Sequence, residues 1–391
     1  MKIGHLFIFL LIFVVIIGCT PGSNGVSYDD RYFPLPDHPV ELVRSEVQDF
    51  YVQPVVDGLQ FPWGMVFLPD GSMLVTERAG TLRLIRDGEL LEEPVEGVPD
   101  VRVGGSSGLM DIALHPDYKE NGWIYMTYSA LEGERAHNTA LMRVRLEGNT
   151  LADHEILFMG YPMTDLPSHS GSRIVFRDGY VYFSIGDRGT MEWAQDLTFH
   201  AGSILRLHED GEVPADNPFV DVENAQPEIF TYGHRNPQGL AFHPETGMLW
   251  AVEHGPKGGD ELNIIEAGEN YGWPVISASG IADDGTLITE LTEKEGMRSF
   301  VYEWTPALAP SSMSFVNSDL YPGWKSSLLI GGLAGMRMVR LELAGDVVIH
   351  EENLLEGIGR IRNVVVGPDQ FIYIAVDSSG EILRLVPAEL F

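Results

Sequence analysis

The chain has 391 residues and 44% of them are hydrophobic, which is enough for one large domain or two small ones. Its formal net charge is −32, and such an acidic chain repels nucleic acid and anionic lipid surfaces. The 43 glycines and 24 prolines indicate many short strands joined by tight turns.

Residues 1–19 are predicted to be a lipoprotein signal peptide. Lys2 supplies a positive start, and the apolar run that follows is shorter than the ~20 residues of a membrane-spanning helix. The run ends in Ile16-Ile17-Gly18-Cys19, which resembles a lipobox and contains the only cysteine of the chain. We therefore expect an exported protein without disulfides, anchored to a membrane by a lipid on Cys19, on the periplasmic or extracellular face. An ordinary signal peptide with a chance cysteine is the alternative.

The next segment, residues 20–48, contains DDRYFPLPDHP and is rich in turn formers. We expect it to be a tether between the anchor and the folded domain.

A pattern of two apolar strands around a Pro/Asp/Gly turn then recurs six times. The copies begin at Phe61, Gly108, Ser172, Pro237, Ser311 and Ile361. Their second strands, measured at Leu74, Ile124, Val181, Leu249, Leu328 and Ile372, are 50, 57, 68, 79 and 44 residues apart. Such a period, lengthened by insertions, is typical of propeller blades.

The sequence therefore predicts an all-β fold over residues 49–391, a six-bladed β-propeller with four-stranded blades. We expect a strand from near the N-terminus to close the last blade, because circular closure removes free sheet edges. Ligands of propellers usually sit at a mouth of the central channel, so functional residues should be scattered, one or two per blade.

One candidate metal loop reads EHGPKGGDELN and begins at Glu253. Its Gly255-Pro256 turn would expose backbone carbonyls, and Asp260 and Glu261 add carboxylates. Calcium prefers six to eight oxygen ligands of these two kinds. The alternative is a turn with a solvated acid pair.

Three further clusters lie beside strand ends. Arg235 and Asn236 stand in YGHRNPQG, where a rigid turn could aim the guanidinium at a carboxylate. His169 precedes a glycine turn and could transfer protons, with Asp187 positioned to orient its ring, although a loop histidine is more often structural.

The last cluster is GRIRN. Arg360 and Arg362 are two residues apart, so on a strand they share one face and need an anion or several acids nearby. Surface salt bridges are the alternative for this pair. Taken together, arginines, a histidine and a calcium-type loop on different blades favour a polyanionic ligand that also chelates a metal.

The chain resembles the soluble PQQ-dependent aldose sugar dehydrogenases of the glucose/sorbosone dehydrogenase family. The resemblance covers nearly the whole mature chain, from GLQFPWGMVFLPDGSMLVTERAG through HSGSRIVF, IGDRG, YGHRNPQG, EHGPKGGDELN and ENYGWP to GRIRNVVVGPDQFIYI. It implies a six-bladed propeller that binds pyrroloquinoline quinone (PQQ), a tricarboxylate, through Ca²⁺.

The resemblance also implies residue roles. His169 matches the general base and Asp187 the acid beside it; Arg235, Asn236, Arg360 and Arg362 match cofactor contacts. The carbonyls of Gly255 and Pro256 match ligands of the cofactor's calcium, and Asp260 and Glu261 match a further calcium site. The implied reaction is oxidation of an aldose sugar to a lactone by hydride transfer to the quinone, with electrons passing to an external acceptor.

Two positions depart from the family pattern. Ser107 stands where the family usually has glutamine, and Ala334 stands where it often has a lysine that reaches the cofactor, unless Arg337 takes that place. These departures favour a second hypothesis, in which the propeller is a lipoprotein that binds carbohydrate or serves as a structural surface module. A calcium-dependent propeller lactonase would share the blade number, but no motif of the sequence supports it.

Overall fold

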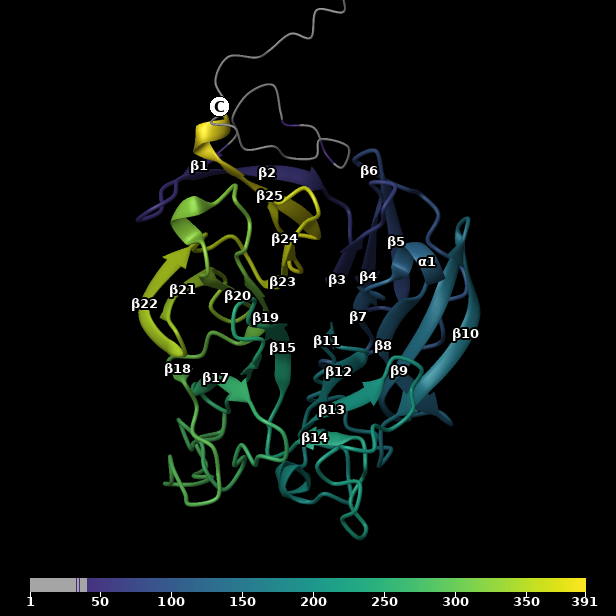
Figure 1. Cartoon of the computed structure of the whole chain (residues 1–391), viewed down its shortest axis with the longest axis vertical. Helices are drawn as coiled ribbons and strands as arrows, with labels where there is room; N and C mark the ends of the chain where they lie inside the picture. The colour runs from purple at the N-terminus through teal and green to yellow at the C-terminus, as the bar shows by residue number, and fades with distance from the viewer. Residues whose placement is uncertain (1–32, 34, 36–40) are drawn as a thin grey trace, which may run out of the picture.

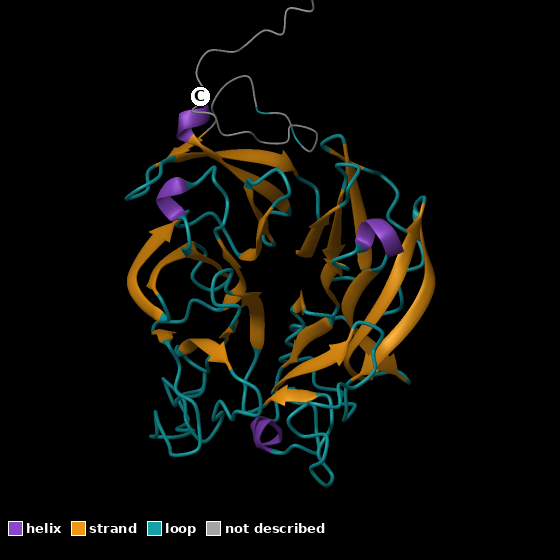
Figure 2. Ribbon diagram, viewed as in Figure 1, coloured by secondary structure: helices purple, strands orange, loops and turns teal. Residues whose placement is uncertain are grey.

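The computed structural model describes residues 33, 35 and 41–391. Six antiparallel sheets surround a central channel in a six-bladed β-propeller (Figure 1, Figure 2), as the repeats predict. In the part of the chain that the structure describes, helix is confined to α1 (Tyr118–Asn121) and the 3-10 turns η1 (Met191–Gln195), η2 (Pro322–Trp324) and η3 (Ala388–Leu390). Within the described residues, therefore, no helix has the length and apolar character needed to cross a bilayer.

The blades follow one another in chain order. Blade 1 contains β3 (Pro62–Phe67), β4 (Met73–Glu77), β5 (Thr81–Arg86) and β6 (Glu89–Leu90); blade 2 contains β7 (Leu109–Leu114), β8 (Ile124–Glu132), β9 (Ala136–Glu147) and β10 (Thr150–Met159). Blade 3 contains β11 (Ile174–Arg177), β12 (Tyr180–Ile185), β13 (Ser203–His208) and β14 (Ile229–Thr231); blade 4 contains β15 (Pro237–Phe242), β16 (Leu249–Glu253), β17 (Asp260–Ile265) and β18 (Tyr302–Trp304). Blade 5 contains β19 (Pro310–Phe315), β20 (Leu328–Gly332), β21 (Met338–Ala344) and β22 (Val347–Leu354).

Blade 6 is closed by a strand from near the N-terminus, as expected. It contains β23 (Ile361–Val366), β24 (Ile372–Val376) and β25 (Glu381–Pro387), and β2 (Phe50–Val56) pairs with β25. The short strand β1 (Glu41–Val43) adds a fifth strand, so this blade is larger than the predicted four. Pairing the two ends of the chain in one sheet ties the ring shut and leaves no open blade edge there.

The core lies between neighbouring blades. All five residues of β4, β16, β20 and β24 are buried, because each of these second strands is covered on both faces by adjacent sheets. This explains continuous apolar runs such as IYIAV in β24. Aromatic rings join the blades: Trp250 of blade 4 meets Phe315 of blade 5 edge-on, with centroids 5.9 Å apart.

The first strands of all the blades run along the channel in the same direction, so their starts lie at one mouth and their ends at the other. In five blades, the pairing of the first two strands shifts register near the start, at Pro62/Met65, Leu109/Ile112, Pro237/Gly239, Pro310/Ser312 and Ile361/Asn363. Such bulges re-aim side chains and are frequent beside active sites. Gln238, Ser311 and Arg362 occupy three of them.

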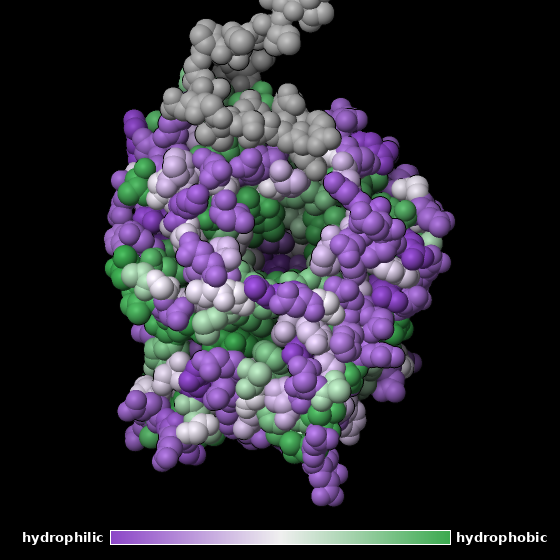
Figure 3. Space-filling model, in the orientation of Figure 1, coloured by the Kyte–Doolittle hydropathy of each residue, from purple (hydrophilic) through white to green (hydrophobic). Residues whose placement is uncertain are grey.

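We call the mouth at the strand starts, which carries His169, Arg235, Arg360 and Arg362, the arginine mouth. We call the mouth at the strand ends, lined by the second halves of β3, β7, β11, β15, β19 and β23, the apolar mouth. Figure 3 shows the hollow at the centre of the ring, with hydrophobic residues on part of its wall.

The signal peptide predicted at residues 1–19, with Cys19, lies outside the described residues, as does most of the tether predicted at 20–48. Both stay predictions.

Candidate active site

His169 and Asp187 meet at the arginine mouth. His169 Nδ1 lies 2.5 Å from Asp187 Oδ1, and the other carboxylate oxygen accepts a hydrogen bond from Trp273 Nε1 at 2.8 Å. Burial by itself raises the pKa of Asp187, but the hydrogen bond and charge of His169, together with Arg235, hold it below its ordinary value. An ionised Asp187 places the ring hydrogen on Nδ1, which leaves the lone pair of Nε2 free to accept a proton.

The backbone at His169 is held in a strained conformation. Its φ is +48°, in the left-handed region that non-glycine residues rarely adopt. Gly186 packs so closely against it that a Cβ there would lie 2.4 Å from the His169 carbonyl oxygen. Asn236 Oδ1 also accepts a hydrogen bond from Gly171 N at 3.1 Å. Asn236, predicted as a cofactor contact, thus fixes the loop that carries the histidine.

Arg360 and Arg362 converge on one carboxylate. Arg360 Nε lies 3.2 Å from Asp377 Oδ1, and Arg362 Nη2 lies 3.3 Å from Asp377 Oδ2. From its bulge, Arg362 also donates through Nη1 to Gln238 Oε1 at 2.8 Å. Burial lowers the pKa of Arg362 to about 10, so the side chain is charged at neutral pH at a desolvation cost.

Arg235 completes the group without a carboxylate of its own. Its guanidinium lies over the ring of Trp273 at 5.4 Å, and Nη1 donates to the His254 carbonyl at 3.3 Å. Within the described part of the chain, it forms no ion pair. Burial and the nearby Arg235 hold the pKa of His254 well below its usual value, so this neighbour adds no charge.

The three guanidiniums of the arginine mouth have few direct ion pairs. Among the described residues, Arg360 and Arg362 share Asp377, whereas Asp187, Asp283, Asp260 and Glu253 act on the charge of Arg235 without forming an ion pair with it. Guanidiniums whose donors are not taken up by direct ion pairs can bind an anionic ligand, and they suit carboxylates because they bond them bidentately. The donor set fits a polycarboxylate such as PQQ.

The candidate calcium loop doubles back on itself. A Cβ on Gly255 would lie 2.2 Å from the Gly259 carbonyl oxygen, so only glycine fits there. Asp260 holds the fold of the loop: Oδ1 accepts from Gly255 N at 2.8 Å and Oδ2 from Ala309 N at 2.6 Å. Among the described hydrogen bonds, none ends on the carbonyl oxygens of Gly255 or Pro256, which leaves both available to a cation.

Glu261 lies beside a second carboxylate, which the sequence did not suggest. Burial, and then the charge of Glu253, raise the pKa of Glu261 to about 8. Both side chains, with Tyr271, line a small cavity of about 10 Å³, enough for one ion or water. Glu253 accepts hydrogen bonds from Asn263 and Arg235 N and contacts His234, whereas Glu261 is bonded by Asn263 at 3.4 Å and by the backbone of Ala278.

These features fit a cation that would neutralise the buried acid pair. Because the described residues contain no cluster of three His, Cys, Asp or Glu side chains, a cation here would need backbone carbonyls or water as further ligands.

The two departures from the family pattern have structural consequences. Ser107 is fully buried and bonds His137 Nε2 at 3.1 Å and Ser170 Oγ at 3.0 Å. Arg188 joins the same network, donating to Ser170 Oγ at 2.8 Å and to His137 Nε2 at 2.9 Å. Through these hydrogen bonds, Ser107 holds Ser170, the residue that follows His169, in place.

At the second departure, Ala334 is exposed. Arg337 donates through Nε to Asn353 at 2.6 Å, so in this structure it does not replace the missing lysine.

The sequence did not reveal the supporting residues Gln238, Asp377, Trp273 and Glu253. Gln238 lies in the motif YGHRNPQG. Its position as the second residue of β15 is the signal that could have identified it as a partner of Arg362. Asp377 gave no comparable signal, because only the fold brings VDSS at the end of β24 against Arg360 and Arg362.

Comparison with known proteins decides the family. The model of the glucose/sorbosone dehydrogenase family matches residues 59–384. The chain belongs to this family. Aldose sugar dehydrogenase YliI of Escherichia coli is 39% identical to it over 344 residues, which cover 86% of this chain and 92% of that protein.

Other similar proteins agree with this. An uncharacterized protein, slr1608, of Synechocystis is 39% identical over 391 residues and 94% of each chain. The apo-form structure of the soluble aldose sugar dehydrogenase from Escherichia coli aligns with a TM-score of 0.83, at 38% identity, over 86% of this chain and 99% of that one. The PQQ-bound aldose sugar dehydrogenase from Streptomyces coelicolor aligns with a TM-score of 0.71, at 29% identity, over 86% and 98%.

Proposed function

We propose that this family member is a PQQ- and calcium-dependent dehydrogenase that oxidises aldose sugars to lactones and passes electrons to an external acceptor. The observation that carries the proposal is the His169–Asp187 pair beside Arg235, Arg360 and Arg362, three guanidiniums for which Asp377 is the one direct ion-pair partner among the described residues. The names of its similar proteins support the same activity.

Each residue has a separate task in this proposal. Arg235, Arg360 and Arg362 donate hydrogen bonds to the carboxylates of the cofactor and fix its orientation. His169 Nε2 accepts the proton of the sugar's anomeric hydroxyl, while Asp187 holds the ring and stabilises the imidazolium that forms. When bound, PQQ with Ca²⁺ would supply the electrophilic carbon that accepts a hydride.

The calcium ligands are assigned within the same proposal. Carbonyl oxygens of Gly255 and Pro256 hold the calcium of the cofactor, and Glu261, beside Glu253, belongs to a further calcium site. Asp260, whose two oxygens bond backbone amides, holds the loop in shape.

Reconstitution tests the proposal. The mature protein is loaded with PQQ and Ca²⁺, and reduction of an artificial electron acceptor is followed with a panel of aldoses. We expect sugar-dependent reduction only when both PQQ and Ca²⁺ are present. Equal reduction without PQQ, or none with any aldose at saturating PQQ, would reject it.

The second candidate is a propeller lipoprotein that binds carbohydrate or acts as a structural surface module. Ser107 and Ala334 favour it, as does the Hedgehog-interacting protein of Homo sapiens, which is named for an interaction and is 28% identical over 257 residues, 57% of this chain and 36% of that protein. Protein that binds sugars but gives no spectral change with PQQ would decide for this candidate.

We also propose export and a lipid anchor on Cys19, from the lipobox-like segment. A Cys19→Ala variant should lose its lipid and leave the membrane fraction. If that variant still fractionated with membranes, a retained N-terminal helix would explain the anchoring instead.

A further inference from the structure

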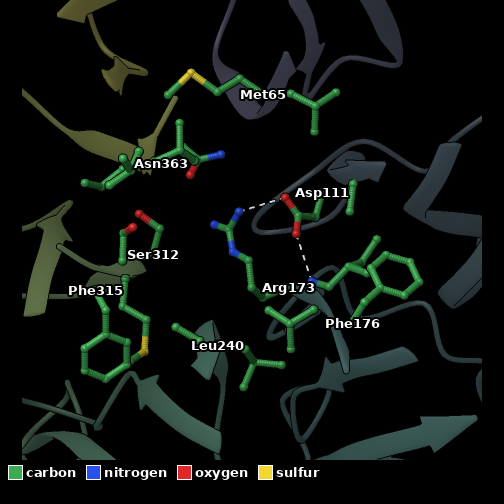
Figure 4. Close-up of a pocket in the computed structure, with 18 of the residues that line it drawn as sticks. Met65, Asp111, Arg173, Phe176, Leu240, Ser312, Phe315 and Asn363 are labelled. Carbon is green, nitrogen blue, oxygen red and sulfur yellow. Dashed lines mark hydrogen bonds and ion pairs between the residues drawn. The ribbon is translucent and has the colours of Figure 1, made fainter. Parts of the chain in front are cut away.

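The apolar mouth contains a cavity of about 650 Å³, within the range of small-molecule sites (Figure 4). Its wall comes from all six blades, because every first strand contributes residues. The apolar members include Met65, Ile112, Phe176, Leu240, Phe315 and Val364. The cavity is separate from the arginine mouth, and no residue assigned to the reaction lines it.

The floor of this cavity is polar but carries no net charge. Arg173 Nη1 pairs with Asp111 Oδ1 at 2.7 Å, and Asp111 Oδ2 accepts a hydrogen bond from Ile174 N at 2.8 Å. The other nitrogens of Arg173 donate to the carbonyls of Gln238 at 3.0 Å and Ser311 at 2.7 Å. Because the charges of Arg173 and Asp111 compensate each other and each nitrogen of Arg173 already has a partner, the floor has no free charge to pair with a charged ligand.

Two polar side chains beside this floor are left without partners. Asn363 is 3% exposed and Ser312 is 1% exposed, and both line the cavity (Figure 4). Among the described residues, Ser312 Oγ is a buried atom without a hydrogen-bond partner, whereas the Asn363 amide makes no side-chain hydrogen bond and is open to the cavity. Buried polar groups are almost always satisfied, so the Ser312 hydroxyl needs an explanation such as a missing ligand.

We propose that the apolar mouth is a second binding site, which takes one uncharged, amphipathic small molecule with an apolar ring body and a carbonyl or hydroxyl head. The head bonds the Asn363 amide, with the Ser312 hydroxyl beside it, and the body packs against the apolar wall. A charged molecule is rejected, because burying its charge there would leave it unpaired.

Two residues contact both this site and the arginine mouth. Trp63, which is 1% exposed, has the guanidinium carbons of Arg173 and Arg362 at 4.4 Å and 5.6 Å from its ring centroid, respectively. Gln238 accepts hydrogen bonds from the same two arginines, through its carbonyl and its side chain. Because none of the residues assigned to PQQ or calcium lines the cavity, binding at the apolar mouth should require neither.

Two related fluorescent probes test the proposal on the folded mature protein. N-phenyl-1-naphthylamine is uncharged, and 1-anilinonaphthalene-8-sulfonate has the same ring skeleton with an added sulfonate. We expect saturable binding of one uncharged probe per chain, and at least about tenfold weaker binding of the sulfonate, since an unpaired buried charge is costly. Equal affinities, or no saturable binding of the uncharged probe, would overturn the proposal.

Variants locate the bound probe. Asn363→Leu keeps the size of the side chain and removes the amide, so it should weaken binding by up to ~10-fold. Val366→Trp puts a large side chain on the wall of the cavity and should abolish binding, whereas Val347→Trp, on an exposed part of β22, should not. Melting curves confirm that each variant is folded. Unchanged affinity in both Asn363→Leu and Val366→Trp would place the probe elsewhere and overturn the proposal.

Discussion

The two mouths of the channel are built from the same six strands, yet they differ in how their charges are balanced. At the apolar mouth, Arg173 has its own carboxylate, Asp111, and its remaining nitrogens all bond carbonyls. At the arginine mouth, Arg360 and Arg362 share Asp377, and Arg235 forms no direct ion pair among the described residues, although carboxylates lie near it. A buried arginine alone therefore does not mark an anion site; a guanidinium without an ion-pair partner of its own does.

The mouths also differ in backbone conformation. The strand ends are regular, whereas the strand starts contain bulges, the left-handed His169 and the tight Gly255 loop. Strained conformations persist only where surrounding contacts enforce them, and they concentrate at functional sites. Strained backbone and guanidiniums with few direct ion pairs thus coincide at one mouth, and each prediction below replaces one side chain of that mouth.

The largest effect on activity is expected from replacing the proposed general base, His169. His169→Gln should lower turnover by about 10²–10⁴-fold, because no other group accepts the proton, while PQQ binding stays within about twofold. Steady-state dye reduction and a PQQ titration on the same preparation measure the two quantities. His154→Gln, in an exposed histidine on β10, is the control and should change neither. Loss of PQQ binding together with turnover would show that His169 holds the cofactor instead.

The next effect concerns the guanidiniums. Arg362→Ala removes a charge-assisted bond worth about 1.5–3 kcal/mol, so PQQ affinity should fall by about 10- to 150-fold. Arg135→Ala, which removes an exposed arginine 3.8 Å from Asp165, should leave the affinity unchanged. An unaltered PQQ affinity in Arg362→Ala would mean that the arginine mouth does not bind the carboxylates.

Calcium should stabilise the loop of blade 4. For the wild-type protein, calcium at about 100 times its Kd should add about 2.7 kcal/mol to the free energy of unfolding. Glu261→Gln should remove most of this gain, whereas Glu303→Gln, in the exposed cross-strand neighbour of Glu261, should keep it. Melting curves with calcium and with chelator measure the difference. Curves that coincide for the wild type would exclude a structural calcium here.

The smallest effect is the pH dependence of the His169–Asp187 pair. The pKa of Asp187 lies below its ordinary value of 3.8, so its ionised form stabilises the fold fully above pH 3.8. This contribution is lost as the pH falls through the lower, folded-state pKa. Asp187→Asn should therefore reduce stability by about 1.5 kcal/mol at pH 7 and by progressively less below pH 3.8. A stability difference that does not vary with pH would contradict an ionised Asp187.

The sequence predicted the fold well, because blade repeats depend on local patterns. Each of the second-strand positions, from Leu74 to Ile372, lies in the second strand of its blade. It also singled out the His169–Asp187 and Arg360–Arg362 clusters, since both lie beside turns at the ends of strands. It could not predict Asp377 or Glu253 as partners, because both contacts depend on the exact register of two neighbouring strands within one blade: Asp377 follows β24 beside Arg360, and Glu253 lies opposite Glu261.

Register was a second limit on prediction. In a regular strand, alternation would place the side chains of Arg360 and Arg362 on one face. The register shift between Ile361 and Asn363 changes the direction of the Arg362 side chain, which bonds Gln238. The same limit applies to Ser107. From the sequence, serine in place of the family's glutamine meant only the loss of a side-chain amide. The fold shows that Ser107 belongs to a hydrogen-bond network with His137, Ser170 and Arg188, next to His169.

The most direct test of the account is an absorption titration of PQQ into the wild-type protein, with saturating calcium and with chelator. The account predicts a saturable spectral change at one PQQ per chain with calcium, and a much weaker one with chelator. No spectral change at saturating calcium would contradict it, and would mean that the guanidiniums of the arginine mouth serve another ligand.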